Sequence, residues 1–222
     1  TSSSATGATT TPGTITADAT YYYSWSKSVT LTYNANAGSG APAQETKTAY
    51  LNYAGSPTNA SFTVSSTTPT RTGYTFQNWN TASNGSGTTY NAGANISTTN
   101  NTTLNAIWKI NTYKIDLNFY VDGTPYWSGY QGTRIKAGLK INGVDKGYVT
   151  DYGTSHEYGS TWEVYGVELD GVKVAYSKTG TLTSTFSLNL EFNTMKFVAN
   201  NSSYGTVSSS ELLIVKGRTF ST

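Results

Sequence analysis

Apolar and polar residues alternate along most of the chain, which is the pattern of β-strands that bury one face. The clearest alternating apolar positions are Val29, Leu31 and Tyr33, and later Tyr113, Ile115, Leu117 and Phe119. Four dipeptides suit tight hairpin turns because their residues tolerate positive φ: Asn84-Gly85, Asp122-Gly123, Asn142-Gly143 and Asp170-Gly171. The pattern predicts a mainly β chain built from antiparallel hairpins, with little helix.

Residues 41–54 are the one stretch with some helical character. Thr46, Thr48 and Tyr50 alternate with other residues there, and no clean helical period is present. We expect a strand or a loop, with a short helix as the alternative.

A closing-strand pattern recurs at a nearly constant spacing. Trp25 and Trp108 end two such stretches 83 positions apart, and Phe192 follows Trp108 after another 84. The interior also repeats, because residues 73–79 overlay residues 159–165 at an offset of 86. A fixed spacing of this kind is typical of tandem modules, each of which is one folding unit.

The spacing divides the chain into four segments. Residues 1–27 form a Ser/Thr-rich linker and the closing strand of a preceding repeat, and residues 28–110 form a complete module. Residues 111–194 form a second, divergent β module, and residues 195–222 the truncated start of a third. Modules this small bury little area, so large side chains must supply most of each core. The predicted core residues are Phe76, Trp79, Tyr90, Leu104, Trp108, Trp162, Tyr176 and Phe192.

The first module carries aromatic residues and glycines in a characteristic order. They are Arg71-Thr72-Gly73-Tyr74-Thr75-Phe76-Gln77-Asn78-Trp79, then Gly85, Gly87, Tyr90, Gly93 and Ile96, and the closing Thr103-Leu104-Asn105-Ala106-Ile107-Trp108. In this order residues 28–110 resemble the Listeria-Bacteroides repeat, the family that includes the B repeat of internalin B. Residues 111–194 resemble a divergent relative. The resemblance implies small β-grasp-like modules in a long bacterial surface protein that acts as a stalk or an adhesin.

Composition narrows the possible functions. The 222 residues include no cysteine, which excludes disulfides, thiolate metal sites and cysteine nucleophiles. The formal net charge is +2 without a block of like charges, so we expect neither nucleic acid nor an anionic membrane as a partner. No apolar run approaches the roughly 20 residues of a membrane helix, so we expect no direct membrane insertion. We expect an extracellular location at the cell surface, with the export signal and the cell-wall anchor outside this segment.

No cluster of residues predicts catalysis, a metal site or a cofactor. His156 is the only histidine, and neither a nucleophile motif nor ligand spacing accompanies it, so we expect a surface or strand-end histidine. Acidic residues stand singly, mostly beside turn glycines: Asp145, Asp151, Glu157, Glu163 and Asp170. We therefore expect no enzyme activity and no cofactor.

A covalent Lys–Asn cross-link would need a lysine, an asparagine and a carboxylate buried together. The candidates are Lys114, Asp116 and Asn118 on one strand and Asn189 and Glu191 on another. They alternate with apolar residues, so we expect them to face solvent and to form no cross-link.

Aromatic residues outside the repeat pattern are the candidate ligand-binding residues. Tyr126, Trp127 and Tyr130 follow a turn and break the alternation, so we expect some of their rings to face water and to stack on sugar rings or partner side chains. Tyr148, Tyr152 and Tyr158 would extend that surface. The alternative is that Trp127 packs at the junction with a neighbouring module.

Two functions remain open. The first is a non-catalytic stalk or spacer, in which each module adds length and stiffness and contacts the neighbouring modules of the same chain. The second is an adhesive module that binds a host or microbial glycan or protein through Tyr126, Trp127 and Tyr130.

Overall fold

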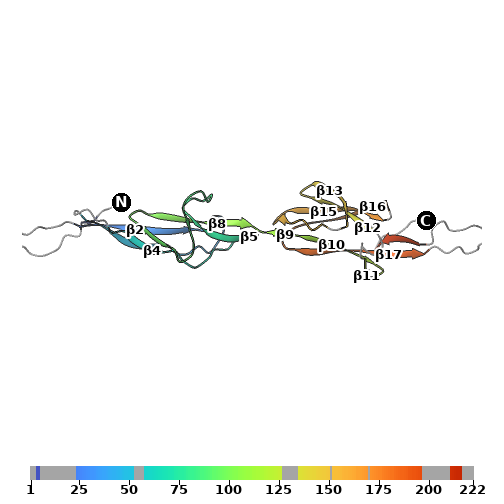
Figure 1. The fold of residues 1–222 in the computed structure, drawn as a ribbon, viewed down its shortest axis with the longest axis horizontal. Helices are drawn as coiled ribbons and strands as arrows, with labels where there is room; N and C mark the ends of the chain where they lie inside the picture. Colours follow the sequence, from blue (N-terminus) through green and yellow to red (C-terminus); the bar gives the residue numbers. More distant parts are fainter. Residues whose placement is uncertain are drawn as a thin grey trace, which may run out of the picture. The chain divides into compact units, whose positions relative to one another are not determined.

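The chain folds into two units made of β-strands. The computed structural model describes residues 4–5, 24–52, 58–126, 135–150, 152–169, 171–196 and 211–216, and no helix occurs among them. Unit 1 is Thr1–Ile110 and unit 2 is Asn111–Thr222 (Figure 1). The prediction of a mainly β chain is confirmed, and the uncertain stretch at residues 41–54 contains a strand rather than a helix. Across the described residues, no helix has the length and apolar character needed to cross a membrane.

Unit 1 contains one main sheet and one small two-stranded sheet. The strands of the main sheet are β1 (Ser4–Ala5), β2 (Ser24–Asn34), β3 (Glu45–Asn52), β5 (Tyr74–Asn80), β6 (Thr89–Tyr90) and β8 (Thr102–Ile110). At the centre β2 and β8 run parallel, with β3 antiparallel on β2 and β5 antiparallel on β8. The small sheet pairs β4 (Ala60–Thr63) with β7 (Asn95–Thr98).

The core of unit 1 lies between these two sheets. Strand alternation directs Val29, Leu31 and Tyr33 inward, toward Phe62 of the small sheet. The remaining buried apolar residues are Ala49, Ala60, Val64, Trp79, Ile96, Leu104 and Ala106. Phe76, Tyr90 and Trp108 are half-buried and pack against this cluster.

Unit 2 is built from two four-stranded sheets and a short strand pair. One sheet contains β10 (Ile115–Val121), β11 (Thr124–Pro125), β17 (Phe186–Lys196) and β18 (Glu211–Val215), and the other β12 (Ile135–Ile141), β13 (Val144–Val149), β15 (Thr161–Leu169) and β16 (Val172–Thr181). The short pair is β9 (Thr112–Tyr113) with β14 (His156–Glu157). The first sheet contains a parallel pair, β10 with β17, and the second is antiparallel throughout. Figure 1 shows β10 and β17 on one side of the unit and β13 and β15 on the other.

The core of unit 2 is filled from both sheets. Leu117, Leu188 and Phe192 come from the sheet that holds the parallel pair, and Leu139 and Trp162 come from the antiparallel sheet. All five are buried, and Tyr176 is half-buried against them. The buried residues of the two units form two separate clusters, one within each unit.

The two units share the way in which their first and last long strands pair. In unit 1 Tyr33 lies opposite Leu104, and in unit 2 Leu117 lies opposite Leu188, a separation of 71 residues in both. In both units a side chain just before β8 or β17 accepts a hydrogen bond from a backbone N–H in β2 or immediately before β10. Asn101 accepts from the Thr30 N–H at 3.0 Å, and the Thr185 hydroxyl accepts from the Lys114 N–H at 3.2 Å.

The interiors of the two units differ, although residues 73–79 overlay residues 159–165 in sequence. Gly73 and Gly159 both have positive φ, 78° and 84°. The strands that follow them pair differently, because β5 joins β8 whereas β15 joins β12 and β16. A bulge in β15 leaves Tyr165 without a partner on β12, which reverses the alternation so that Val164 and Val167 both face the core. Tyr165 therefore does not occupy the buried position that Trp79 has in unit 1.

Two of the four predicted hairpin turns have positive φ at both central residues, as a tight turn requires. These are Asp122-Gly123, with φ of 50° and 77°, and Asn142-Gly143, with 50° and 76°. Gly171 has φ of 83°, and Asp170 lies outside the described residues.

The prediction of a tight turn at Asn84-Gly85 is wrong. These residues lie in a longer connection, residues 81–88, between β5 and β6. The buried Asn80 side chain organises this connection, because it donates to the carbonyls of Gly85 and Gly87 and accepts from the N–H groups of Ala82 and Gly87. A buried amide that satisfies so many backbone groups replaces the turn geometry that the dipeptide alone would provide.

Two of the predicted segment boundaries, after residues 27 and 194, fall inside a strand rather than between strands. Residues 24–27, assigned from the sequence to the end of a preceding repeat, continue directly into β2. After residue 194, β18 pairs antiparallel with β17, from Phe192 opposite Val215 to Lys196 opposite Glu211. The third module that the sequence suggests stays a prediction.

We expect Leu104→Ala to destabilise unit 1 by about 2–5 kcal/mol, because a fully buried leucine at the central strand leaves a cavity. Thr103→Ala is the matched control, since Thr103 is exposed on the same strand and its change is expected to stay within about 0.5 kcal/mol. Hydrogen exchange of the β2 and β8 amides measures both effects. Equal losses in the two variants would contradict this description of the core.

Candidate functional site

The three aromatic residues predicted to bind a ligand are only partly described. Tyr126 is half-buried and packs against the core of unit 2, and its N–H donates to the Phe119 carbonyl at 2.8 Å. Trp127 and Tyr130 lie outside the described residues. Of the tyrosines that could extend this surface, Tyr148 makes an edge-on contact with Tyr165, at 5.6 Å between ring centroids, and Tyr152 contacts His156.

His156 lies in the short strand β14. Its ring stacks on Tyr152, with 5.5 Å between centroids, and Nε2 lies 3.0 Å from the Tyr152 hydroxyl. Burial, followed by the nearby Lys146 charge, lowers the pKa of His156. In the described ranges, no three His, Asp or Glu side chains gather to hold a metal ion.

The acidic candidates occupy turns and ion pairs. Asp145 accepts hydrogen bonds from the Gly147 N–H and the Tyr165 hydroxyl, and these bonds lower its pKa. Glu163 pairs with Lys140 at 3.2 Å. Glu157 is exposed in β14, and Asp151 and Asp170 lie outside the described residues.

The cross-link candidates line one face of the parallel pair in unit 2. Asn118 donates to the Asn189 side chain at 3.2 Å, and Lys114 is exposed. Asp116 is half-buried, and Glu191 forms an ion pair with Lys216. These side chains are not enclosed together.

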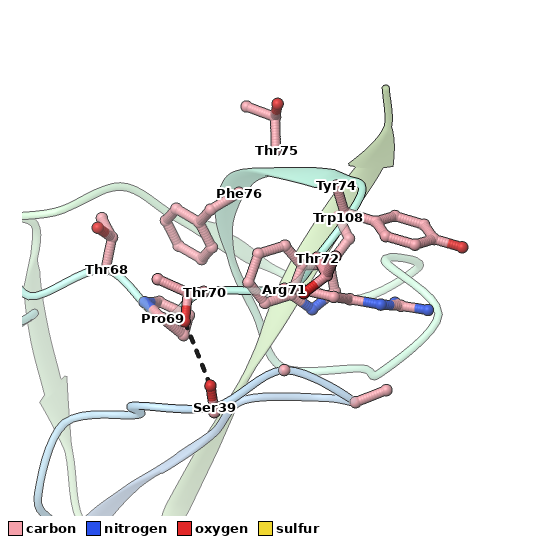
Figure 2. A pocket seen from close by; sticks show the side chains of 12 residues that line it. Ser39, Thr68, Pro69, Thr70, Arg71, Thr72, Tyr74, Thr75, Phe76 and Trp108 are labelled. Carbon is pink, nitrogen blue, oxygen red and sulfur yellow. Dashed lines mark hydrogen bonds between the residues drawn. The ribbon is translucent and has the colours of Figure 1, made fainter. Parts of the chain in front are cut away.

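Unit 1 has an open groove of about 900 Å³ between the loop after β2 and the start of β5 (Figure 2). It is lined by Ala37, Gly38, Ser39, Thr68, Pro69, Thr70, Arg71, Thr72, Tyr74, Thr75, Phe76 and Trp108. Serine and threonine side chains contribute five of these twelve positions, and Arg71 is the only charged residue among them. A few polar groups beside aromatic rings are typical of a small-molecule or sugar site.

Phe76 and Trp108 form the aromatic part of the groove. They are cross-strand partners on β5 and β8, with edge-to-face rings 5.8 Å apart, and Phe76 also contacts the buried Trp79 at 5.2 Å. The Trp108 indole N–H donates to the carbonyls of Ala35 and Asn36, both at 3.0 Å. These contacts hold both rings in fixed orientations.

Arg71 and Tyr74 form one wall of the groove. The Tyr74 N–H donates to the Arg71 carbonyl at 3.1 Å, and Gly73 supplies the positive φ that this turn requires. The turn places the Arg71 guanidinium over the Tyr74 ring, with its central carbon 3.7 Å from the ring centroid. Figure 2 shows the guanidinium beside Tyr74, with Ser39 and Thr70 linked across the groove.

Gly38 allows the loop after β2 to approach Trp108. A Cβ at this position would lie 2.5 Å from Trp108 Cζ2 and 2.7 Å from the Thr70 carbonyl oxygen, far inside contact distance. The neighbouring Ala37 has φ of 70°, so the loop holds a non-glycine residue in the left-handed region. Asn36 fixes the loop further by donating to the carbonyls of Ser83 and Ala106.

A smaller hollow of about 440 Å³ lies on unit 2. It is lined by Lys140, Gly143, Thr161, Trp162, Glu163, Thr179, Gly180 and Thr181. The only charged residues in this lining, Lys140 and Glu163, neutralise each other. Lys140 also lies over Tyr165, whose pKa is raised to about 12 by burial and then by its bond to Asp145. The groove on unit 1 therefore has the more distinctive chemistry.

Sequence reasoning assigned Phe76 and Trp108 to the core and overlooked the groove. Both residues do pack against the core, and each also lines the groove. The signal present in the sequence was the Arg71–Tyr74 spacing around Gly73, which suits a turn that stacks the two side chains. No pattern in the sequence indicated that residues 37–39 lie against Trp108 and Thr70.

We expect Gly38→Ala to destabilise unit 1 by about 1–3 kcal/mol and to shift the Trp108 indole N–H resonance, because the added methyl overlaps the Trp108 ring. Ala37→Gly is the matched control at the adjacent position. It relieves a left-handed alanine, and stability should change by less than about 1 kcal/mol. Urea unfolding and the indole N–H signal report both variants, and an unshifted signal in Gly38→Ala would contradict the packing described.

Comparison with known proteins bears on unit 1. Searches of curated proteins and of solved structures give no significant match. The family model described as the Listeria-Bacteroides repeat domain matches residues 30–107, a range that includes the end of β2, all of β3 to β7 and most of β8. This family is found in bacterial surface proteins. The resemblance of the first module to this family is thus confirmed, since the family model matches residues 30–107.

Proposed function

We propose that this chain is a non-catalytic spacer in the stalk of a secreted bacterial surface protein, displayed outside the cell and attached to the cell wall through other regions. The repeat family supports this proposal because it occurs in bacterial surface proteins. The same family supports the proposal that the chain has no catalytic role. The structure supports it too, because His156 and the described carboxylates lie in separate contacts and form no common cluster.

The observation that carries the proposal is the parallel pairing of the first and last long strands within each unit. Because β2 and β8 run in the same direction, the chain enters unit 1 at one end of this pair and leaves at the other. The two strands together advance by up to about 50 Å at about 3.3 Å per residue. This length runs along β2 from Ser24 to Leu31 and then along β8 from Thr102, the partner of Leu31, to Ile110. Strands β10 and β17 provide the same arrangement in unit 2.

This strand order supports a β-grasp-like module for unit 1. A central parallel pair with one antiparallel strand on each side, in the order β3-β2-β8-β5, fits such a module without a helix. Unit 2 keeps the parallel pair and its spacing of 71 residues, which supports a divergent relative repeated in tandem. The rest of unit 2 has its own topology.

Parallel pairing also determines how a unit would bear tension. A force that pulls its two chain ends apart acts along β2 and β8 in opposite directions, so the hydrogen bonds of the ladder are loaded together. Residues Leu31 to Asn34 face Thr102 to Asn105 in this ladder, and seven residue pairs face each other in unit 2. A spacer that must stay extended under load benefits from this arrangement.

We expect unit 1 to unfold at a clearly higher force when it is pulled along its parallel strands than when they are peeled apart. The chain has no cysteine, so single-molecule handles can be placed by substitution. Ser28→Cys with Lys109→Cys loads the ladder along its length. Ser28→Cys with Asn100→Cys pulls both chains from the same end of the pair, because Asn100 lies beside Lys27. All three side chains are exposed.

Equal unfolding forces for the two handle pairs, or a lower force for the lengthwise pair, would contradict the load-bearing role. Both variants contain the same Ser28→Cys change, so a difference between them reports the direction of pulling rather than the substitution.

A further inference from the structure

The groove on unit 1 contains an arginine whose charge no ion pair in the described part of the chain neutralises. Arg71 takes part in none of the described ion pairs. Its guanidinium is instead held over the Tyr74 ring at 3.7 Å. Stacking restrains the side chain while the N–H groups on the guanidinium edge stay available, and their fork matches the two oxygens of a carboxylate.

The surroundings of Arg71 favour an anionic ligand. No acidic residue lines the groove. In the described part of unit 1, Glu45 is the only acidic residue, whereas Lys27, Lys47, Arg71 and Lys109 are basic. An approaching anion therefore meets a positive field with no opposing carboxylate in the lining.

The rest of the lining suits a sugar ring. Phe76 and Trp108 offer half-buried aromatic surface for the apolar face of a pyranose, and both rings are fixed by their edge contacts and by the Trp108 hydrogen bonds. Hydroxyl groups that can exchange hydrogen bonds with sugar hydroxyls surround them, on Ser39, Thr68, Thr70, Thr72 and Thr75. The groove is open, as entry of one unit of a longer glycan requires.

We infer that this groove binds a carboxylate-bearing sugar, with the carboxylate on Arg71 and the ring against Phe76 and Trp108. One cation fits the one carboxylate that each sialic or uronic acid unit carries. An acidic peptide with several carboxylates would call for several cations, and the lining contains a single one. This binding role goes beyond the spacer function and assigns an adhesive site to unit 1 rather than to Tyr126 of unit 2.

The test is a titration of the full chain followed by nuclear magnetic resonance and calorimetry. The probes are 3′-sialyllactose with lactose as its neutral counterpart, and a hyaluronan tetrasaccharide with its carboxyl-reduced form. The expected result is that one acidic sugar shifts the Trp108 indole N–H and Arg71 side-chain signals, while its neutral counterpart binds at least about tenfold more weakly. The two acidic probes distinguish a sialic acid from a uronic acid.

Arg71→Gln should weaken binding of the acidic sugar by about tenfold or more, and Arg71→Lys should restore only part of it because the ammonium lacks the planar fork. Lys109→Gln is the matched control. Lys109 is exposed on β8 next to Trp108 and does not line the groove, so its removal should change affinity by less than about twofold. Unchanged Trp108 and Trp79 signals in the free variants establish that the groove has kept its fold.

Three outcomes would overturn the inference. The first is the absence of any shift at the groove with either acidic sugar at millimolar concentration. The second is binding that the neutral sugars match or that Arg71→Gln leaves unchanged. The third is Arg71-dependent binding of a tetraglutamate peptide without binding of the acidic sugars, which would assign the groove to an acidic peptide instead.

Discussion

The parallel pairing between the first and last long strands of each unit is the constraint on which the rest of the structure depends. It joins residues 71 positions apart, so closing the ladder costs the conformational entropy of a long loop. The same ladder brings Leu31, Tyr33 and Leu104 into one core and aligns Trp108 with the loop after β2. Core, groove and direction of the chain therefore all follow from one strand contact.

Around this ladder, unit 1 uses aromatic residues for two purposes. Trp79 is fully buried, in contact with Tyr33 and Phe76, and supplies much of the apolar area that a small unit needs. Phe76 and Trp108 continue the same cluster to the surface, where they line the groove. Because the groove rests directly on the core, its rings can be rigid without any additional supporting layer.

The sequence alone predicted the strands and the repeat pattern of the first module, but it did not predict which distant strands pair. Alternation at Val29 to Tyr33 identified a strand with one buried face, and two Asx-Gly pairs identified tight turns. Alternation does not specify which strand lies beside which, so the parallel partners and the different interior of unit 2 could not be predicted. The loop around Asn80 was not predicted because it depends on one buried amide. The sequence overlay places Tyr165 at the position of the buried Trp79, and this failed because a bulge in β15 shifts the register. The groove was missed for the same reason, since residues 37–39 meet residues 68–76 only after the sheet has formed.

The most direct test of the account is the distance between spin labels at the two ends of the parallel pair in unit 1. With spin labels on Ser28→Cys and Lys109→Cys, pulsed electron spin resonance should report about 33 Å between the two backbone positions. This distance corresponds to ten residue steps of about 3.3 Å each along the paired strands. If β8 instead ran antiparallel to β2 from the same contact, the labels would lie within about 20 Å. That shorter distance would contradict the parallel ladder, and with it the spacer function derived from it.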